Sequence, residues 1–204
     1  YYNESGSIDT LISAALEGTG DFEGASDIVR YQGIARLTAN MGMVALTIHE
    51  LNTAVSKADA GNVNNNSGAP HNWDEAWAFF HGPDEFYVCS PAKSMQNMAP
   101  YFGTVDDDGV AATFAATEAA MIDGLSALQA NDADGYNAAV DTIMKNIIIA
   151  NSQAVLKYAQ YMDSDTDAER YQAKGYVYLK SMEAYAAPFM DGCYHSVLHR
   201  VTMM

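Results

Sequence analysis

Residues 28–55, IVRYQGIARLTANMGMVALTIHELNTAV, contain the pattern that decides the fold. Apolar side chains recur along this stretch at steps of three and four residues, or at sums of these steps. Because an α-helix has about 3.6 residues per turn, this spacing places them on one side of a helix. The set comprises Ile28, Ile34, Met41, Val44, Ile48, Leu51 and Val55. We expect one long amphipathic helix from about Ala25 to Ala60, in which Gly33 and Gly42 either weaken the helix or let a neighbouring helix come close.

Shorter helices are predicted on both sides of this one. Ser7 precedes an apolar stretch that ends at the Gly-Thr-Gly of residues 18–20, which indicates a short capped helix. Residues 61–70 are rich in Gly and Asn and predict an exposed loop. Asn72 then caps a short helix whose aromatic stripe includes two tryptophans, and the Gly-Pro pair at 82–83 ends it.

The second half of the chain continues the helical pattern. A short helix ends near Phe102, and three longer segments follow at about residues 109–130, 134–162 and 165–187. No strand-like alternation competes with these helices. With 204 residues, the chain favours one domain over two. We therefore predict an all-α, single-domain helical bundle over residues 1–204, either a mature secreted domain or a fragment of a longer precursor.

The charge of the chain is strongly acidic. Asp and Glu number 26 against 10 Lys and Arg, a net charge of −16 at pH 7. Such a surface repels nucleic acid and anionic lipid head groups, which excludes both as partners, and it attracts cations. Solubility alone explains the same surplus of carboxylates. No apolar run approaches the roughly 18 residues of a membrane span, so we expect no insertion into a membrane.

Two cysteines and two glycosylation sequons favour a compartment outside the cytoplasm. Cys89 and Cys193 are far apart in sequence, and the sequons begin at Asn3 and Asn65 in stretches rich in Gly, Asn and Ser. Together these features predict a Cys89–Cys193 disulfide in a secreted, periplasmic or extracellular glycoprotein. The alternative is two buried free thiols.

The segment from His71 to Gly82, HNWDEAWAFFHG, is the densest in chemically informative residues. On a helix, the i, i+3 and i, i+4 spacing lets the His71 imidazole share a site with Asp74 or Glu75. Imidazole and carboxylate are ligands that iron, zinc and manganese accept. Alternatively, the two carboxylates stabilise the helix N-terminus through its dipole and His71 is a loop residue.

Further candidate ligands lie on other predicted helices. His49 and Glu50 follow the buried position of Ile48, and Glu118 falls on the apolar face of the helix at 109–130. A carboxylate on an apolar face is costly unless it is paired or bound to a metal, and its alternative is a hydrogen bond or ion pair to a neighbouring helix. The Glu-x-x-His pair of ferritin-like di-iron sites is missing, which argues against a ferroxidase.

Residues 47–51 (TIHEL), the Asn-rich loop and residues 71–82 together resemble the algal iron-assimilating family of periplasmic proteins that high CO2 and low iron induce. Residues 16–22, LEGTGDF, are similar to the same family and to related secreted algal proteins. The resemblance covers the first half of the chain, to about Gly103. The family is secreted, responds to iron supply and is thought to help gather iron at the cell surface, without a well-established catalytic activity.

The resemblance implies a metal-binding protein and not an enzyme. The family's His-x-Trp-Asp-Glu and His-Glu-Leu motifs map onto five candidate ligands: His71, Asp74, Glu75, His49 and Glu50. Our leading hypothesis is an extracytoplasmic protein that binds iron through these residues, with Glu118 as a sixth, and assists iron acquisition at the cell surface. Zinc and manganese are the alternative metals.

The second hypothesis comes from a different class. The protein would be a structural or interaction module of an extracellular or cell-surface assembly, with the tryptophans as core and the carboxylates as solvated surface. The 13 tyrosines support it, because Tyr serves interfaces well. Self-association and binding to cell-surface proteins are the partners that this hypothesis adds to the metal ion.

Overall fold

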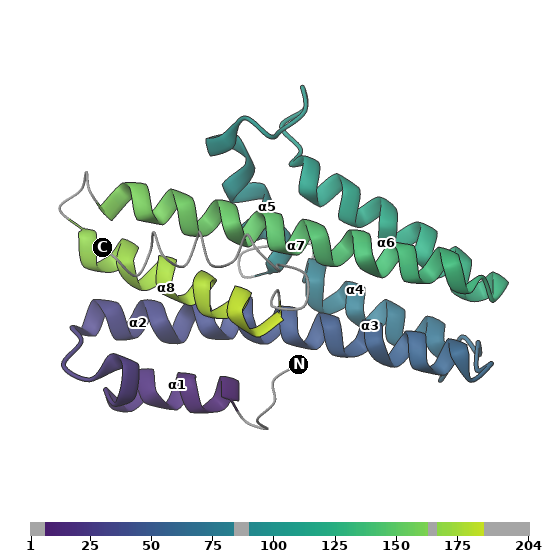
Figure 1. The fold of residues 1–204 in the computed structure, drawn as a ribbon, viewed down its shortest axis with the longest axis horizontal. Coiled ribbons are helices and arrows are strands. Elements are labelled where there is room, and N and C mark those ends of the chain that lie inside the picture. The colour runs from purple at the N-terminus through teal and green to yellow at the C-terminus, as the bar shows by residue number, and fades with distance from the viewer. Residues whose placement is uncertain (1–6, 84–89, 163–166, 186–204) are drawn as a thin grey trace. The chain divides into compact units, whose positions relative to one another are not determined.

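The computed structural model of the protein describes residues 7–83, 90–162 and 167–185. These ranges are helical apart from short connections, and within them the β contact is an isolated bridge between Val105 and Ala111 (Figure 1). The α-helices are α1 (Ser7–Glu17), α2 (Asp27–Arg36), α3 (Met43–Asp59), α4 (Ala69–His81), α5 (Pro91–Met98), α6 (Ala112–Ala130), α7 (Ala133–Met162) and α8 (Ala168–Tyr185). Shorter helical segments are η1 (Gly20–Phe22), η2 (Leu37–Gly42) and η4 (Ala99–Phe102). The all-α prediction is confirmed.

The predicted long helix is present as three consecutive segments. It runs from Asp27 to Asp59 through α2, a π-helical segment η2 and α3. Four residues of the predicted apolar stripe are buried: Met41, Val44, Ile48 and Leu51. The π-helical segment, with its wider hydrogen-bond spacing, shifts the register between α2 and α3, so the buried stripe is not that of one straight α-helix.

Contacts within the fold group the chain into two compact units. One comprises residues 1–42 and 151–204, and the other comprises residues 43–150. Both boundaries fall inside helical segments, at Gly42 and at Ala150. The prediction of a single domain over residues 1–204 stays a prediction.

In the first unit, α2 packs against α1 and α8. Phe22 is 2% exposed and meets Tyr176 of α8 edge to face, with ring centroids 6.0 Å apart. A Cβ atom at Gly33 would lie only 2.5 Å from Cε1 of Phe22. Of the two roles predicted for Gly33, the close approach is therefore the one that the fold uses, because any larger residue would displace the ring.

A buried polar contact also joins the helical elements of this unit. The side-chain amide nitrogen of Asn40, in η2, donates to Asn151 Oδ1 at 3.4 Å and lies 3.3 Å from Ser181 Oγ. All three residues are buried. Because buried polar groups are costly without partners, this contact fixes how η2, α7 and α8 pack there.

In the second unit, α3 and α4 lie side by side with extensive contact, and α4 also packs on α5 and α6 (Figure 1). The start of α4 differs from the prediction. The helix begins at Ala69 with Gly68 as its N-cap and Pro70 in the first turn, so Asn72 lies inside the helix and does not cap it. Proline suits a first turn because the missing N–H has no partner there. A Cβ atom at Gly68 would come 2.5 Å from the backbone nitrogen of Asn64, so the tight turn requires glycine.

Candidate functional site

A polar junction joins α3 to α4, and Asn72 lies at its centre. Asn72 is 7% exposed, and its amide nitrogen donates to Glu50 Oε2 at 2.5 Å and to Glu75 Oε2 at 3.3 Å. Its amide oxygen accepts a 2.6 Å hydrogen bond from Lys57 Nζ. One buried amide thus links two carboxylates from different helices to one ammonium group. We call Glu50, Lys57, Asn72 and Glu75, together with His71, the α3–α4 junction.

His71 joins this junction through Glu75. The imidazole Nε2 lies 3.4 Å from Glu75 Oε1, at the i, i+4 spacing expected from the sequence, and both side chains are nearly half exposed. His71 lies in the first turns of α4 and not in a loop. The contact is an ion pair when the imidazole is protonated, and a neutral imidazole offers a nitrogen lone pair to a metal.

The predicted ligands do not form a single group. Glu50 contacts α4 through Asn72, whereas its neighbour His49 is exposed on α3. One residue along a helix is a rotation of about 100° around its axis, which separates the two side chains. Among the residues that the structure describes, no three His, Cys, Asp or Glu side chains lie close enough together to hold one metal ion. Asp74 and Glu118 lie elsewhere, at a pocket.

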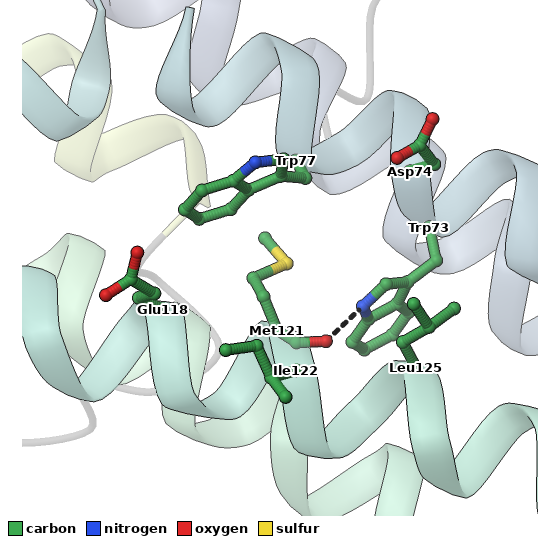
Figure 2. A pocket seen from close by; sticks show the side chains of 7 residues that line it. All are labelled: Trp73, Asp74, Trp77, Glu118, Met121, Ile122 and Leu125. Carbon is green, nitrogen blue, oxygen red and sulfur yellow. Dashed lines mark hydrogen bonds between the residues drawn. The ribbon is translucent and has the colours of Figure 1, made fainter. Parts of the chain in front are cut away.

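This pocket lies between α4 and α6 and has a volume of about 240 Å³. Its lining, drawn in Figure 2, comprises Trp73, Asp74, Trp77, Glu118, Met121, Ile122 and Leu125. Five of these side chains are apolar or aromatic, and two are carboxylates. The pocket is therefore apolar inside, with charge at its edge.

Trp73 anchors α4 to α6 at the base of the pocket. It is 2% exposed, and its indole N–H donates a 2.8 Å hydrogen bond to the carbonyl oxygen of Met121, the dashed line in Figure 2. A Cβ atom at Gly124 would lie 2.2 Å from Cζ2 of the same indole. The absence of a side chain at Gly124 therefore creates the space that the tryptophan fills.

Trp77 forms another wall of the pocket. Its ring stacks on the His81 imidazole, with centroids 4.8 Å apart and an interplanar angle of 25°, and it packs on Phe80 at 5.7 Å. Phe80 is buried, whereas Trp77 is partly exposed. The two tryptophans of the motif thus differ: Trp73 is core, and Trp77 has a surface available within the pocket.

The structure corrects the prediction that Glu118 lies on a buried face of its helix. The spacing places Glu118 on the apolar face of α6, where burial is costly, but the side chain is exposed. The buried positions of this helix are Thr113, Phe114, Thr117, Ala120, Met121, Gly124 and Leu128. Glu118 lies beside that face, at one end of the pocket, and Asp74, also exposed, lies at the other end in Figure 2.

Two residues of the junction were not predicted as part of a site. The sequence pattern favours Asn72 as a helix cap and gives Lys57 no role. Pro70 was the available signal for Asn72, because proline favours the first helical turn and so places Asn72 within the helix. Lys57 lies seven residues after Glu50, two turns along the same face of α3, which is a weaker signal.

Comparison with known proteins places the chain in a family. Residues 2–185 match the family model described as low iron-inducible periplasmic protein. The chain belongs to this family. The match confirms the resemblance found in the sequence and extends it well beyond Gly103. Searches of the curated proteins and of the solved structures found no match.

Membership in this family confirms a periplasmic setting and a link to low iron. Within the described ranges, no helix has both the length and the apolar character needed to cross a membrane. Of the predicted modifications, Asn65 lies in an exposed turn of the loop before α4. Asn3, Cys89 and Cys193 lie outside the described residues, so the disulfide and the first sequon stay predictions.

Proposed function

We propose that this protein captures iron as cargo in the periplasm at the α3–α4 junction, where Glu50, His71 and Glu75 draw closer together around the ion than they lie in this structure. The supporting observation is that one side chain, Asn72, holds carboxylates from two helices together, with the His71 imidazole 3.4 Å from the second carboxylate. Membership in a family that low iron induces supports capture of a scarce ion. The proposed role is binding and delivery, without catalysis.

The donors of the junction match the chemistry of iron. Imidazole nitrogen combined with carboxylate oxygen is the ligand type of many non-haem iron sites. Each carboxylate has lone pairs beyond those that accept from Asn72, and these remain available to an ion. The net charge of −16 raises the local concentration of cations at the surface and favours their capture.

The junction also has features that weaken binding. Lys57 Nζ lies 2.6 Å from Asn72 Oδ1, and its positive charge opposes a cation nearby. Any ion must compete with the Asn72 amide for the two carboxylates. Because His71 and Glu75 are nearly half exposed, water competes as well. These features suit a cargo that exchanges, in contrast to a cofactor that is retained.

Equilibrium dialysis with ferrous iron under anaerobic conditions, and with zinc and manganese in parallel, tests the proposal. Loss of one ligand, in Glu75→Gln or His71→Gln, is expected to weaken iron binding by about tenfold or more. His49→Gln is the matched control, since it removes a neighbouring imidazole that lies outside the junction. It should leave the affinity within about twofold of the wild type.

Two results would overturn the proposal. Absence of stoichiometric iron on the wild-type protein would favour the structural or interaction role instead. Equal losses in Glu75→Gln and His49→Gln would show that the bound ion responds to general surface charge and not to this junction.

A further inference from the structure

We propose that the pocket between α4 and α6 binds a small organic ammonium ion that carries an apolar group. This goes beyond iron binding and rests on different residues. The pocket is lined by two tryptophans, three aliphatic or thioether side chains and two carboxylates. Such a lining suits a ligand that is largely apolar and carries one positive charge.

The apolar surface of the pocket is open to solvent on the α6 side. Ile122 is 62% exposed, and Leu125 and Trp77 are partly exposed. Exposed apolar side chains occur singly on most surfaces, but here they line one cavity of about 240 Å³. This volume is below the usual range for drug-sized ligands, so the occupant is a small molecule.

The two carboxylates at its edge determine the charge of the ligand. Glu118 and Asp74 are exposed, lie at opposite ends of the pocket in Figure 2, and form no hydrogen bond or ion pair within the described part of the chain. Among the residues that the structure describes, no ammonium or guanidinium group lines the pocket with them. An anionic ligand would be repelled, whereas a cation gains from both carboxylates.

Trp77 supplies a second attraction for a cation. The face of an indole ring attracts ammonium groups more strongly than other side-chain rings do. His81 and Phe80 hold this ring in place from the side of α4, so it need not be ordered when a ligand binds. Glu118 and Trp77 both line the pocket, and Figure 2 shows both away from the end where Asp74 lies.

The same geometry disfavours a bare metal ion at this place. Asp74 and Glu118 belong to no group of three ligand side chains among the described residues, and the surface between them is indole and aliphatic. A metal ion needs four to six donors at about 2 Å, which apolar side chains do not provide. An organic cation needs no coordination sphere, and its alkyl groups gain from the apolar lining.

Intrinsic fluorescence gives a direct test, because the chain has two tryptophans and both line this pocket. We suggest titrating the full chain with three compounds that share an aromatic ring and differ in charge: benzyltrimethylammonium, benzyl alcohol and phenylacetate. The ammonium compound should change the tryptophan fluorescence saturably, with an affinity about tenfold higher than that of benzyl alcohol. Phenylacetate should not change the fluorescence. High salt should weaken the ammonium affinity, since the carboxylates are exposed.

Variants locate the site. Glu118→Gln should weaken binding of the ammonium compound by about three- to tenfold. Ile122→Ala should weaken binding of both the ammonium compound and benzyl alcohol. Asp123→Asn is the matched control, because Asp123 is an exposed carboxylate of the same helix outside this pocket. Equal affinity for the charged and neutral compounds, equal effects of Glu118→Gln and Asp123→Asn, or no saturable binding would overturn the proposal. All three substitutions are at exposed positions, so folding is retained.

Discussion

The side-chain amide of Asn72 donates a 2.5 Å hydrogen bond to the Glu50 carboxylate and so links α4 to α3. A neutral donor between two carboxylates reduces their mutual repulsion while leaving both negatively charged. The junction therefore combines a structural role with the donor set proposed for iron. The two roles make opposite demands on residue 72: stability of the metal-free protein requires a hydrogen-bond donor, whereas iron binding gains from an oxygen ligand.

Asn72→Asp separates these demands. The substitution replaces the donor with a third carboxylate, which should destabilise the metal-free protein by about 1–3 kcal/mol. The same carboxylate adds an oxygen ligand, so iron affinity should rise several-fold, by up to about tenfold. Urea unfolding with and without ferrous iron measures both effects. Asn66→Asp, in the exposed loop, is the control and should change neither. A lower iron affinity in Asn72→Asp would argue against the junction as the binding site.

Gly124→Ala tests the packing beneath the pocket. The added methyl group would lie 2.2 Å from Cζ2 of Trp73 and 2.8 Å from the Cβ atom of Ala139, so the core must shift. Overpacking of this kind costs about 1–3 kcal/mol, and urea unfolding should report that loss. Gly175→Ala is the matched control, because its methyl group would meet Tyr158 at an ordinary 3.6 Å. Equal stabilities of the two variants would refute the packing of Trp73 against Gly124.

Arg30 holds the C-terminus of α1. Its Nε donates a 2.9 Å hydrogen bond to the Ala15 carbonyl oxygen, and its Nη2 donates to that of Leu16. Helix C-termini leave such carbonyls without partners in the helix, so Arg30→Met should destabilise the protein by about 1–3 kcal/mol. Amide hydrogen exchange should speed up most in α1. Lys145→Met removes an exposed charge and should change stability by less than about 0.5 kcal/mol. Unchanged exchange in α1 would rule out this capping role.

Because Tyr158 is buried, we expect the folded protein to lose stability at high pH. Burial raises its pKa from 10.0 to about 12, and the neighbouring Tyr178 adds to the shift while Arg36 opposes it. The ionised phenolate is therefore disfavoured in the folded state relative to the unfolded state. Its contribution to stability is complete below pH 10 and is lost as the pH rises towards about 12.

Denaturation across that pH range, with Tyr158→Phe beside the wild type, checks this expectation. The variant cannot ionise at residue 158, so its stability should fall less steeply with pH. The difference in ultraviolet absorbance between the wild type and the variant reports the Tyr158 phenol alone. This difference should titrate with a pKa above the ordinary value for tyrosine. A difference spectrum that titrates near pH 10 would show that Tyr158 is not buried as described.

The helices could be predicted because their signal is local. The apolar spacing around Ile48 and Leu51 reports which side of α3 is buried, whatever packs against it. The sequence pattern places the start of α4 four residues too late, because Asn72 resembles a cap whereas the cap is Gly68. The Asn72 amide instead bonds with side chains of both helices, a tertiary contact that spacing cannot reveal.

The candidate site was less predictable than the fold for the same physical reason. Whether His49 or Glu50 contacts α4 depends on a single-residue rotation of α3, which periodicity does not resolve. Similarly, the pocket lies between α4 and α6, which meet where Trp73 packs on Gly124, two residues that are far apart in sequence. The motif around Trp73 supplies residues to both the junction and the pocket, and the division of its carboxylates between the two required the structure.

The most direct test of the iron proposal is a ¹H–¹⁵N correlation spectrum of the protein with ferric citrate, compared with gallium citrate as the diamagnetic control. Ferric iron broadens the signals of nearby amides, whereas gallium has similar chemistry without this effect. Iron at the α3–α4 junction should broaden residues 49–51 and 71–76 selectively, and Glu75→Gln should abolish that pattern. Broadening centred on Glu118 and α6, or the same spectrum with both metals, would contradict the account.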